Sequence, residues 1–245
     1  MRAKIILVLL ALMTSLGFST NEEASFSFLG GFSTFNQILK KPSGAFDDNT
    51  TNDFGLYVGV YGERYLSPSW SLTPGIYLSQ KNTKLKSDDA FRKATYLEAS
   101  SLLRWYFVDN GNWRSYFGVG GGFGILLSVE DSSADGTSAE MKGAFSKNEL
   151  SFQGGWGIEF PVGAETGLQL GITYSRSLTN FLDPGLSQGD RGTWSGFYSF
   201  AALRFKNRVE SNNPEERARD YLRWKNSGSS YKSSDSEDFD STSAE

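Results

Sequence analysis

The sequence contains no histidine and no cysteine. The missing cysteine excludes disulfides, thiol nucleophiles and thiolate metal ligands. The missing histidine removes the side chain that most often acts as a general base, which excludes hydrolases that depend on a Ser-His or Cys-His pair. Paired carboxylates remain for acid-base chemistry, but Glu159 and Glu165 flank a predicted turn and are more simply interpreted as solvated or ion-paired. We therefore predict a protein that is not an enzyme and has no catalytic residue, cofactor or metal site.

Long apolar runs are also missing. A membrane helix needs about 20 apolar residues, whereas the run at 5–13 is much shorter. It follows Arg2 and Lys4 and precedes the small residues Gly17 and Ser19, which is the three-part pattern of a secretory signal peptide. We expect residues 1–19 to be that signal peptide; a buried N-terminal helix is the alternative. No cysteine lies near the cleavage point, so a lipid-anchored form is not expected.

Positive charge is in slight deficit, with 24 Lys and Arg against 28 Asp and Glu and a formal net charge of -4. A general affinity for nucleic acid is therefore not expected. Glycine and aromatic residues are abundant instead, with 27 Gly, 19 Phe, 11 Tyr and 6 Trp. Because no apolar run is long enough for a membrane helix, this chain can enter a membrane only as strands.

Apolar and polar residues alternate with a period of two through most of the chain, which is typical of β-strands. The alternating segments, separated by turn residues, predict eight strands at 24–35, 53–66, 70–81, 95–108, 113–129, 147–160, 165–178 and 193–205. The eighth strand is ambiguous. Phe197 and Leu203 share one face, but Trp194 and Tyr198 occupy the other.

The fifth strand shows best how the two faces differ. Its apolar face carries Phe117, Val119, Phe123, Ile125 and Leu127, and its other face carries Gly118, Gly120, Gly122 and Gly124. Alternation alone fits a soluble, lipocalin-like barrel equally well. However, an eight-stranded barrel is only wide enough for its own side chains, and a Gly- and Ser-rich face fits that interior better than Phe, Trp and Leu do. We therefore expect the apolar face to lie against lipid.

The predicted connections alternate in length. Long ones follow the odd-numbered strands, at 36–52, 82–94, 130–146 and 179–192, and short ones lie at 67–69, 109–112 and 161–164. Long extracellular loops alternating with tight periplasmic turns are typical of outer-membrane barrels. Aromatic residues near the strand ends predict two interfacial girdles: Tyr65, Trp70, Trp105, Phe107, Trp113 and Phe160 at the turns, and Phe54, Tyr96, Phe152 and Trp194 at the loops.

These segments predict an all-β fold: an eight-stranded antiparallel transmembrane β-barrel over residues 24–205, with short periplasmic turns and long extracellular loops. An even number of strands returns the chain to the periplasm, so both mature termini are expected there. The composition changes abruptly after the barrel, and residues 206–245 form a charged, Ser-rich tail. Asn213-Pro214 is a helix start signal, which predicts a short helix over 214–225. We expect this tail either to dock on a periplasmic partner or the inner leaflet, or to serve as a charged linker.

Several segments resemble the PorT-like outer-membrane β-barrel proteins, also described as porin-family or OmpA/OmpX-like barrels. The resemblance extends over about residues 25–205 and rests on the motifs at 96–98, 104–107, 116–122, 155–159 and 173–175. It implies a Gram-negative cell envelope, with outer-membrane lipid and the barrel-assembly machinery as partners. The end of the last strand, Leu203-Arg204-Phe205, is similar to the aromatic signal that this machinery reads, although Phe200 stands where that signal usually has glycine.

Two function classes remain open. The first is a structural or interaction barrel in the cell envelope, and the second is a narrow porin-like channel for small solutes. We favour the first, because side chains fill most of the lumen of an eight-stranded barrel. A soluble ligand-binding barrel is a distant third.

Charged residues on the lumen face bear on this choice. With the strand directions above, six of them, three of each sign, point inward near the periplasmic turns: Glu63, Arg104, Arg114, Glu159, Glu165 and Arg204. A selective pore tends to line itself with one sign of charge. The balance therefore favours a closed plug of ion pairs, with Arg104 as its deepest member. The alternative is that these charges reach water at the barrel mouth, where exposed pairs contribute little.

Overall fold

A computed structural model describes residues 24–41, 43, 46–47, 50–85, 90–110, 112–133, 138–140, 143, 145–163, 166–182 and 191–206. The predicted signal peptide, the predicted tail beyond Lys206 with its helix at 214–225, and Glu165 lie outside the described residues. Within the described ranges, no helix has the length and the apolar character needed to cross a membrane.

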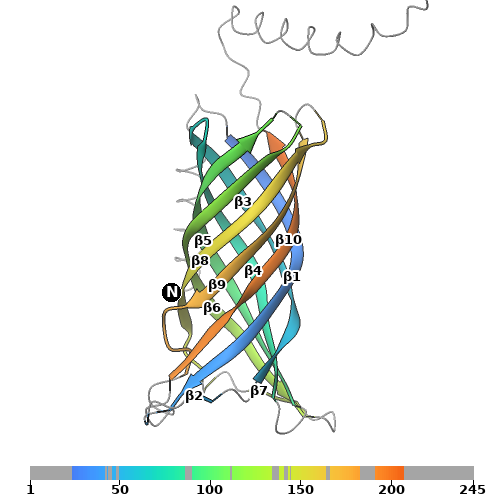
Figure 1. Cartoon of the computed structure of the whole chain (residues 1–245). Coiled ribbons are helices and arrows are strands. Elements are labelled where there is room, and N and C mark those ends of the chain that lie inside the picture. Colours follow the sequence, from blue (N-terminus) through green and yellow to red (C-terminus); the bar gives the residue numbers. More distant parts are fainter. Residues whose placement is uncertain are drawn as a thin grey trace, which may run out of the picture. The chain divides into compact units, whose positions relative to one another are not determined.

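The described chain folds into a closed antiparallel β-barrel (Figure 1). Its eight long strands are β1 (Ala24–Lys40), β3 (Thr50–Ser67), β4 (Trp70–Leu85), β5 (Phe91–Asp109), β6 (Arg114–Ser132), β8 (Asn148–Pro161), β9 (Thr166–Ser177) and β10 (Arg191–Lys206). Two short strands, β2 (Phe46–Asp47) and β7 (Ser138–Glu140), pair with β1 and β6. Each long strand pairs with its neighbours in the sequence, and β10 pairs with β1 from Ser25↔Lys206 to Lys40↔Arg191, which closes the barrel.

All eight predicted strands are confirmed, but several continue beyond their expected ends. β1 runs to Lys40, and β4 and β5 stay paired up to Lys84↔Phe91. The expectation that 36–52, 82–94 and 130–146 are entirely loops is therefore wrong, since parts of each are strand. A hydrogen-bonded ladder needs no apolar surface, so it can continue where the alternating pattern that predicts strands has already faded.

We name the two ends of the barrel after their connections. At the turn end, β3 joins β4 through Pro68 and Ser69, and residues 110–113 and 162–165 make the other tight connections. At the loop end lie β2, β7 and the four longer connections (Figure 1). The connections at the loop end are longer than the turns as predicted, but the one between β4 and β5, at 86–90, is only one residue longer than the turn at 110–113.

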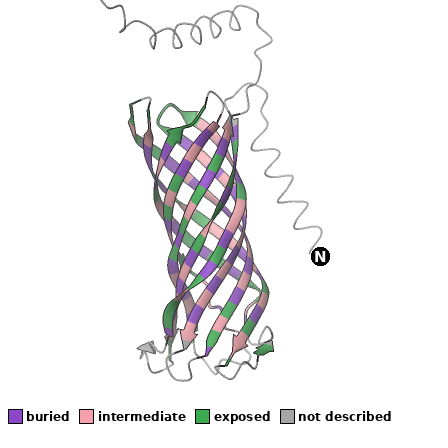
Figure 2. Ribbon diagram, turned by 90° about the vertical axis from the view of Figure 1, so that its right-hand side faces the viewer, coloured by how far each residue is buried: buried purple, intermediate pink, exposed green. Residues whose placement is uncertain are grey.

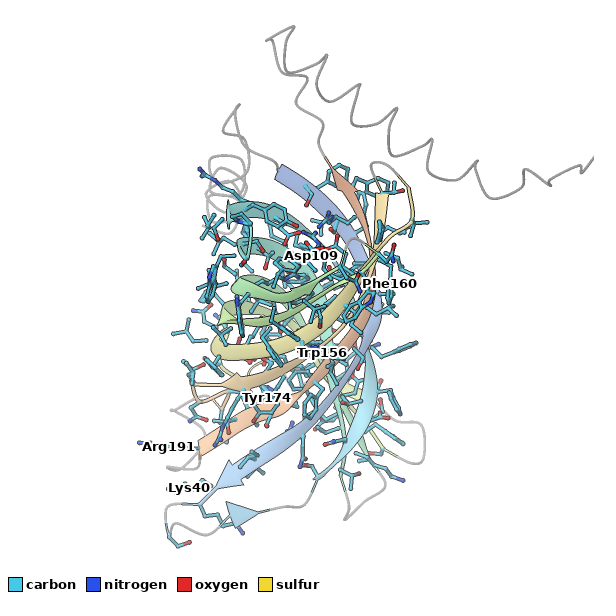
Figure 3. All side chains as sticks on the ribbon, turned by 45° about the horizontal axis from the view of Figure 1, so that its top comes forward. Lys40, Asp109, Trp156, Phe160, Tyr174 and Arg191 are labelled. Carbon is cyan, nitrogen blue, oxygen red and sulfur yellow. The ribbon has the colours of Figure 1, made fainter. Side chains whose placement is uncertain are left out.

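The apolar face points outward. On β1, Phe26, Phe28 and Phe32 are exposed, Phe32 by 64%, whereas Ser25, Ser27 and Ser33 are buried in the lumen. Buried and exposed residues alternate along every strand, which gives the banded pattern of Figure 2. Side chains cover the outer surface and also fill the interior (Figure 3), and Trp156 and Phe160 of β8 lie on the outer surface. The apolar residues predicted to face lipid thus lie on the outside of the barrel, as a transmembrane barrel requires.

The structure also settles the ambiguous eighth strand. Phe197 and Leu203 of β10 face outward, while Trp194, Tyr198 and Arg204 lie in the lumen. Three residues predicted for the aromatic girdles are therefore misplaced, because Tyr96 and Trp194 are fully buried inside and the Tyr65 hydroxyl bonds to lumen arginines. Their hydroxyl and indole N–H groups find partners there, which compensates for the loss of water.

Candidate functional site

The lumen is the part of the barrel where polar side chains converge, and glycine makes room for the large ones. A Cβ at Gly75 of β4 would collide with the Tyr77 ring, and one at Gly157 of β8 would collide with the Tyr116 ring. Lumen-facing glycines thus leave space for tyrosine rings, one from the same strand and one from the neighbouring strand. Along the barrel axis, the interior divides into four layers.

The first layer, at the turn end, is the turn-end charge cluster: Glu63, Arg104, Arg114, Glu159 and Arg204, with the hydroxyls of Ser71, Tyr65 and Tyr106. Arg204 bridges the two carboxylates, because its Nη1 lies 2.6 Å from Glu159 Oε1 and 3.3 Å from Glu63 Oε2. Arg114 Nη2 donates to both oxygens of Glu159, at 2.9 and 3.0 Å. Five strands thus contribute one charge each, and the structure brings together every described member of the predicted set.

Neutral hydroxyl groups also donate hydrogen bonds to Glu63. Its Oε1 accepts hydrogen bonds from Ser71 Oγ at 2.7 Å and from Tyr106 OH at 2.5 Å. The Tyr65 hydroxyl accepts from Arg114 at 2.7 Å and from Arg204 at 2.9 Å. With only 2% of Glu63 and of Arg204 exposed, these contacts belong to a buried network and not to a solvated mouth.

Arg104 differs from the other arginines of the cluster. Its Nη1 lies 3.9 Å from Glu63 Oε1, which is an ion-pair distance but too long for a hydrogen bond. The guanidinium instead lies against two rings, with its central carbon 4.8 Å from the Tyr61 centroid and 4.4 Å from the Tyr116 centroid. Cation–π contact therefore stabilises this residue more directly than an ion pair does.

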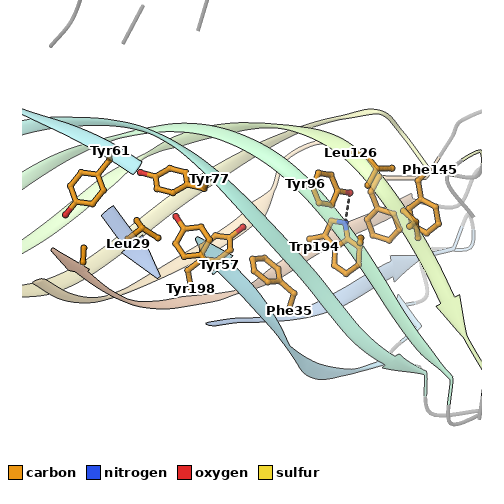
Figure 4. Packing of buried hydrophobic residues seen from close by; sticks show 14 residues of the cluster. Leu29, Phe35, Tyr57, Tyr61, Tyr77, Tyr96, Leu126, Phe145, Trp194 and Tyr198 are labelled. Carbon is orange, nitrogen blue, oxygen red and sulfur yellow. Dashed lines mark hydrogen bonds between the residues drawn. The ribbon is translucent and has the colours of Figure 1, made fainter. Parts of the chain in front are cut away.

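The second layer is aromatic and spans the middle of the barrel (Figure 4). The Tyr57 ring stacks on Tyr77 at 5.2 Å and on Tyr198 at 4.1 Å, and Tyr198 packs on Phe35 at 5.0 Å. Toward the turn end, Gln169 of β9 accepts a hydrogen bond from Tyr61 and donates one to Tyr116. Because these residues come from strands on different sides of the barrel, the layer crosses the lumen.

The third layer, which the sequence analysis missed, is the lysine cluster of Lys81, Glu98 and Glu149. Lys81 Nζ lies 2.6 Å from Glu149 Oε1 and 3.0 Å from Glu98 Oε1, and it also faces the rings of Phe35 and Tyr96. Three hydroxyl groups donate hydrogen bonds to the two carboxylates: Ser79 and Tyr198 to Glu98, and Ser177 to Glu149. The alternation could have revealed it, because Lys81 follows Ser79 on the lumen face of its strand.

The fourth layer is the aromatic cap of Phe145, Phe181 and Trp194 at the loop end. Phe145 and Phe181 stack at 5.5 Å, and Phe181 packs on Trp194 at 5.0 Å. The two connections that supply the phenylalanines are joined by the Phe145↔Leu182 bridge. Arg92, paired with Asp131 at 2.6 Å, lies over the Phe145 ring. No sequence signal indicated this cap, because both phenylalanines come from predicted loops.

Within the described residues, these layers offer ion pairs, hydroxyls and aromatic rings. Among the described residues, no three acidic side chains gather in a way that could hold a metal ion. Each carboxylate of the turn-end cluster is engaged by arginines or hydroxyls. The arrangement is best suited to holding the strands together across the lumen.

A closed barrel with an apolar outer belt and a filled polar lumen defines a β-barrel membrane protein. The chain belongs to the family of the outer membrane protein beta-barrel domain, whose sequence profile matches residues 16–183. This membership assigns the protein to the bacterial outer membrane.

Solved structures of similar barrels share little sequence with this chain. Ail of Yersinia pestis, in complex with the heparin analogue sucrose octasulfate, is 16% identical, with 75% of this chain and 99% of that chain covered and a TM-score of 0.39. Outer membrane protein W of Escherichia coli is 13% identical, with 76% and 99% covered and a TM-score of 0.43. The outer membrane protease OmpT of Escherichia coli is 10% identical, with 78% and 99% covered and a TM-score of 0.42. None of the curated protein sequences matches this chain.

Proposed function

We propose that this protein is a non-enzymatic structural or interaction barrel of the bacterial cell envelope, with a sealed lumen. The observation that carries the proposal is the succession of four side-chain layers across the lumen, from the turn-end charge cluster to the aromatic cap. A solute moving along the axis would have to displace buried ion pairs twice and stacked rings twice.

The absence of histidine and cysteine supports the non-enzymatic part of the proposal. Hydrolytic chemistry on a barrel of this kind would need another general base, and the buried glutamates are already engaged by arginine, lysine and hydroxyl partners. A carboxylate held by several donors is a poor base, because accepting a proton breaks those contacts.

We further propose that the turn end and both mature termini face the periplasm, and that the protein is of the PorT-like type within its family. The alternation of tight and long connections supports this orientation. The partners that follow are outer-membrane lipid along the exposed aromatic belt and the barrel-assembly machinery at the end of β10. A periplasmic partner for the tail and the lack of any nucleic-acid partner complete the proposal.

Planar-bilayer recording of the purified protein tests the sealed lumen. We expect no steady conductance from the unaltered barrel. The double variant Tyr57→Ala, Tyr198→Ala removes the two rings that stack at 4.1 Å in the middle layer but leaves the other three layers in place, so it should stay closed as well. Co-flotation of the protein with lipid vesicles controls for insertion. Steady conductance of the unaltered protein would overturn the proposal and favour the narrow channel.

A further inference from the structure

Among the described residues, the turn-end charge cluster holds one more cation than carboxylates; Glu165, the sixth member predicted from the sequence, lies outside them. Its described charged members are three arginines and two glutamates. Glu159 is shared by Arg114 and Arg204, and Glu63 is engaged by Arg204, Ser71 and Tyr106. Both carboxylates are therefore satisfied without Arg104.

Arg104 is buried, with 3% of the residue exposed, and two of its three donor nitrogens are not used. Within the described part of the chain, neither Nε nor Nη1 of Arg104 has a hydrogen-bond partner, and the same holds for Nε of Arg204. The rings of Tyr61 and Tyr116 contact the guanidinium, but a ring stacked on its face leaves the N–H groups around its edge unsatisfied. Buried donors without acceptors are rare and costly, most of all when they are charged.

The two arginines approach the same carboxylate from different strands. Nη1 of Arg104 on β5 lies 3.9 Å from Glu63 Oε1, and Nη1 of Arg204 on β10 lies 3.3 Å from Glu63 Oε2. Both guanidiniums therefore lie beside Glu63, and the described charges of the cluster sum to about +1. An acceptor that carries a single negative charge would satisfy both the donors and the surplus.

We propose that Arg104, together with Nε of Arg204, forms a buried site for one small monovalent anion of about the size of chloride. The surplus of one charge among the described members favours a monovalent ion over a divalent one. The rings of Tyr61, Tyr106 and Tyr116 pack directly on Arg104 and Arg114, which favours a small ion over a large one. The ion enters from the turn end, where the Arg114 side chain is 20% exposed. This site is independent of the proposed function, since a sealed barrel and a conducting one could both hold it.

Thermal unfolding in zwitterionic detergent micelles tests the site, with chloride as the probe. The purified full chain is unfolded in sodium chloride and in sodium gluconate at equal ionic strength, so that general screening is the same in both. Chloride should raise the Tm in a saturable way, by about 3–6 °C at ten times its Kd. The protein should also broaden the ³⁵Cl NMR line, and nitrate should compete with that broadening.

Arg104→Met removes the charge and the unused donors while it keeps a long apolar side chain against the two rings. It should lose both the chloride-dependent rise in Tm and the line broadening. Arg92→Met changes the net charge of the protein equally, but it removes an arginine that is already paired with Asp131 at the loop end, so it should keep both effects.

Equal Tm values in chloride and gluconate, with no ³⁵Cl broadening by the unaltered protein, would overturn the proposal. A chloride effect that persists in Arg104→Met, or that Arg92→Met abolishes, would also overturn it by locating the anion elsewhere. The NMR measurement needs only the unaltered protein, so the proposal stays testable even if Arg104→Met fails to fold.

Discussion

Arg204 joins the two carboxylates of the turn-end charge cluster. Its Nη1 is the nearest cation to Glu63 and also contacts Glu159, at 3.3 and 2.6 Å, whereas Arg104 makes no hydrogen bond to either. Depth in the lumen, the property that singled out Arg104 in the sequence, is thus a poor guide to electrostatic importance. What matters is which guanidinium has its N–H groups directed at a carboxylate, and that depends on side-chain conformations that a sequence does not specify.

Substitution of Arg204 should therefore destabilise the barrel more than substitution of Arg104. We expect Arg204→Met to lower the free energy of unfolding by about 3–5 kcal/mol, because it leaves Glu63 buried without its bridging cation. Arg104→Met loses mainly cation–π contact and should cost less than about 2 kcal/mol. Urea unfolding of the refolded barrel in micelles measures both.

The double variant Arg204→Met, Glu63→Gln is the control for this interpretation. Removing the stranded carboxylate together with its partner should recover part of the loss. An equal cost for the two arginine variants, or no recovery in the double variant, would contradict the assignment of Arg204 as the bridge.

At the scale of single strands, the first strand pairs with the last, β1 with β10, along a seam that closes the barrel. Of the neighbouring glycines Gly30 and Gly31 on β1, only Gly31 lies close to the backbone of β10. A Cβ at Gly31 would lie 2.7 Å from Phe200 Cα and even closer to the carbonyl oxygen of Ser199, whereas a Cβ at Gly30 would have nothing within 4 Å. Gly30 lies on the outward face, and Gly31 lies on the lumen face opposite Phe200.

Alanine at these two positions should therefore have opposite effects. We expect Gly31→Ala to destabilise the barrel by about 1–3 kcal/mol, because the seam must open to admit the methyl group. Gly30→Ala should be neutral or stabilising by up to about 1 kcal/mol, because it only restricts the unfolded chain. The urea midpoints of unfolding of Gly31→Ala and Gly30→Ala, measured in the same micelles, test this difference. Similar losses at both positions would mean that the seam is not the tight contact described here.

The lipid face of β6 gives a second test at this scale. Val119 is 54% exposed and pairs with Leu103 on β5 and Gly154 on β8. Near the bilayer midplane, Val119→Arg should lower the free energy of unfolding in lipid vesicles by about 2–4 kcal/mol. Val119→Leu is the matched control and should change little. If arginine is tolerated as well as leucine in lipid, the outward face of β6 is not in contact with the membrane.

Strand order and facing could be predicted because period-two alternation records which side of each strand meets lipid. The pattern fails where the register shifts. β5 and β6 pair as Thr95↔Ser128 and then Tyr96↔Leu126, which leaves Leu127 as an extra residue on β6. After Leu127 the inward and outward positions of β6 are exchanged, so Val129 lies in the lumen. The aromatic cap was not predictable at all, because Phe145 and Phe181 belong to connections whose paths depend on tertiary contacts.

For the whole barrel, the sealed interior and the direction of insertion are separate questions. The lumen is closed near both ends, by the turn-end charge cluster and by the aromatic cap, so its layers do not reveal which end meets the outside. Orientation depends instead on the connections, because outer-membrane barrels have short turns on the periplasmic side and longer loops on the extracellular side. The lack of native cysteine makes this readily testable, since a single introduced cysteine is the only thiol.

We expect a cysteine at Ser132, at the loop end of β6, to react with a membrane-impermeant maleimide on intact cells. A cysteine at Ser67, next to the β3–β4 turn, should react only after the outer membrane is permeabilised, because the turn end faces the periplasm. Both positions lie at strand ends away from the apolar belt, so equal labelling in permeabilised cells controls for accessibility. Reaction at Ser67 but not at Ser132 on intact cells would reverse the proposed orientation, and it would also put the turn-end charge cluster, with the access route of the anion site, on the outer surface of the cell.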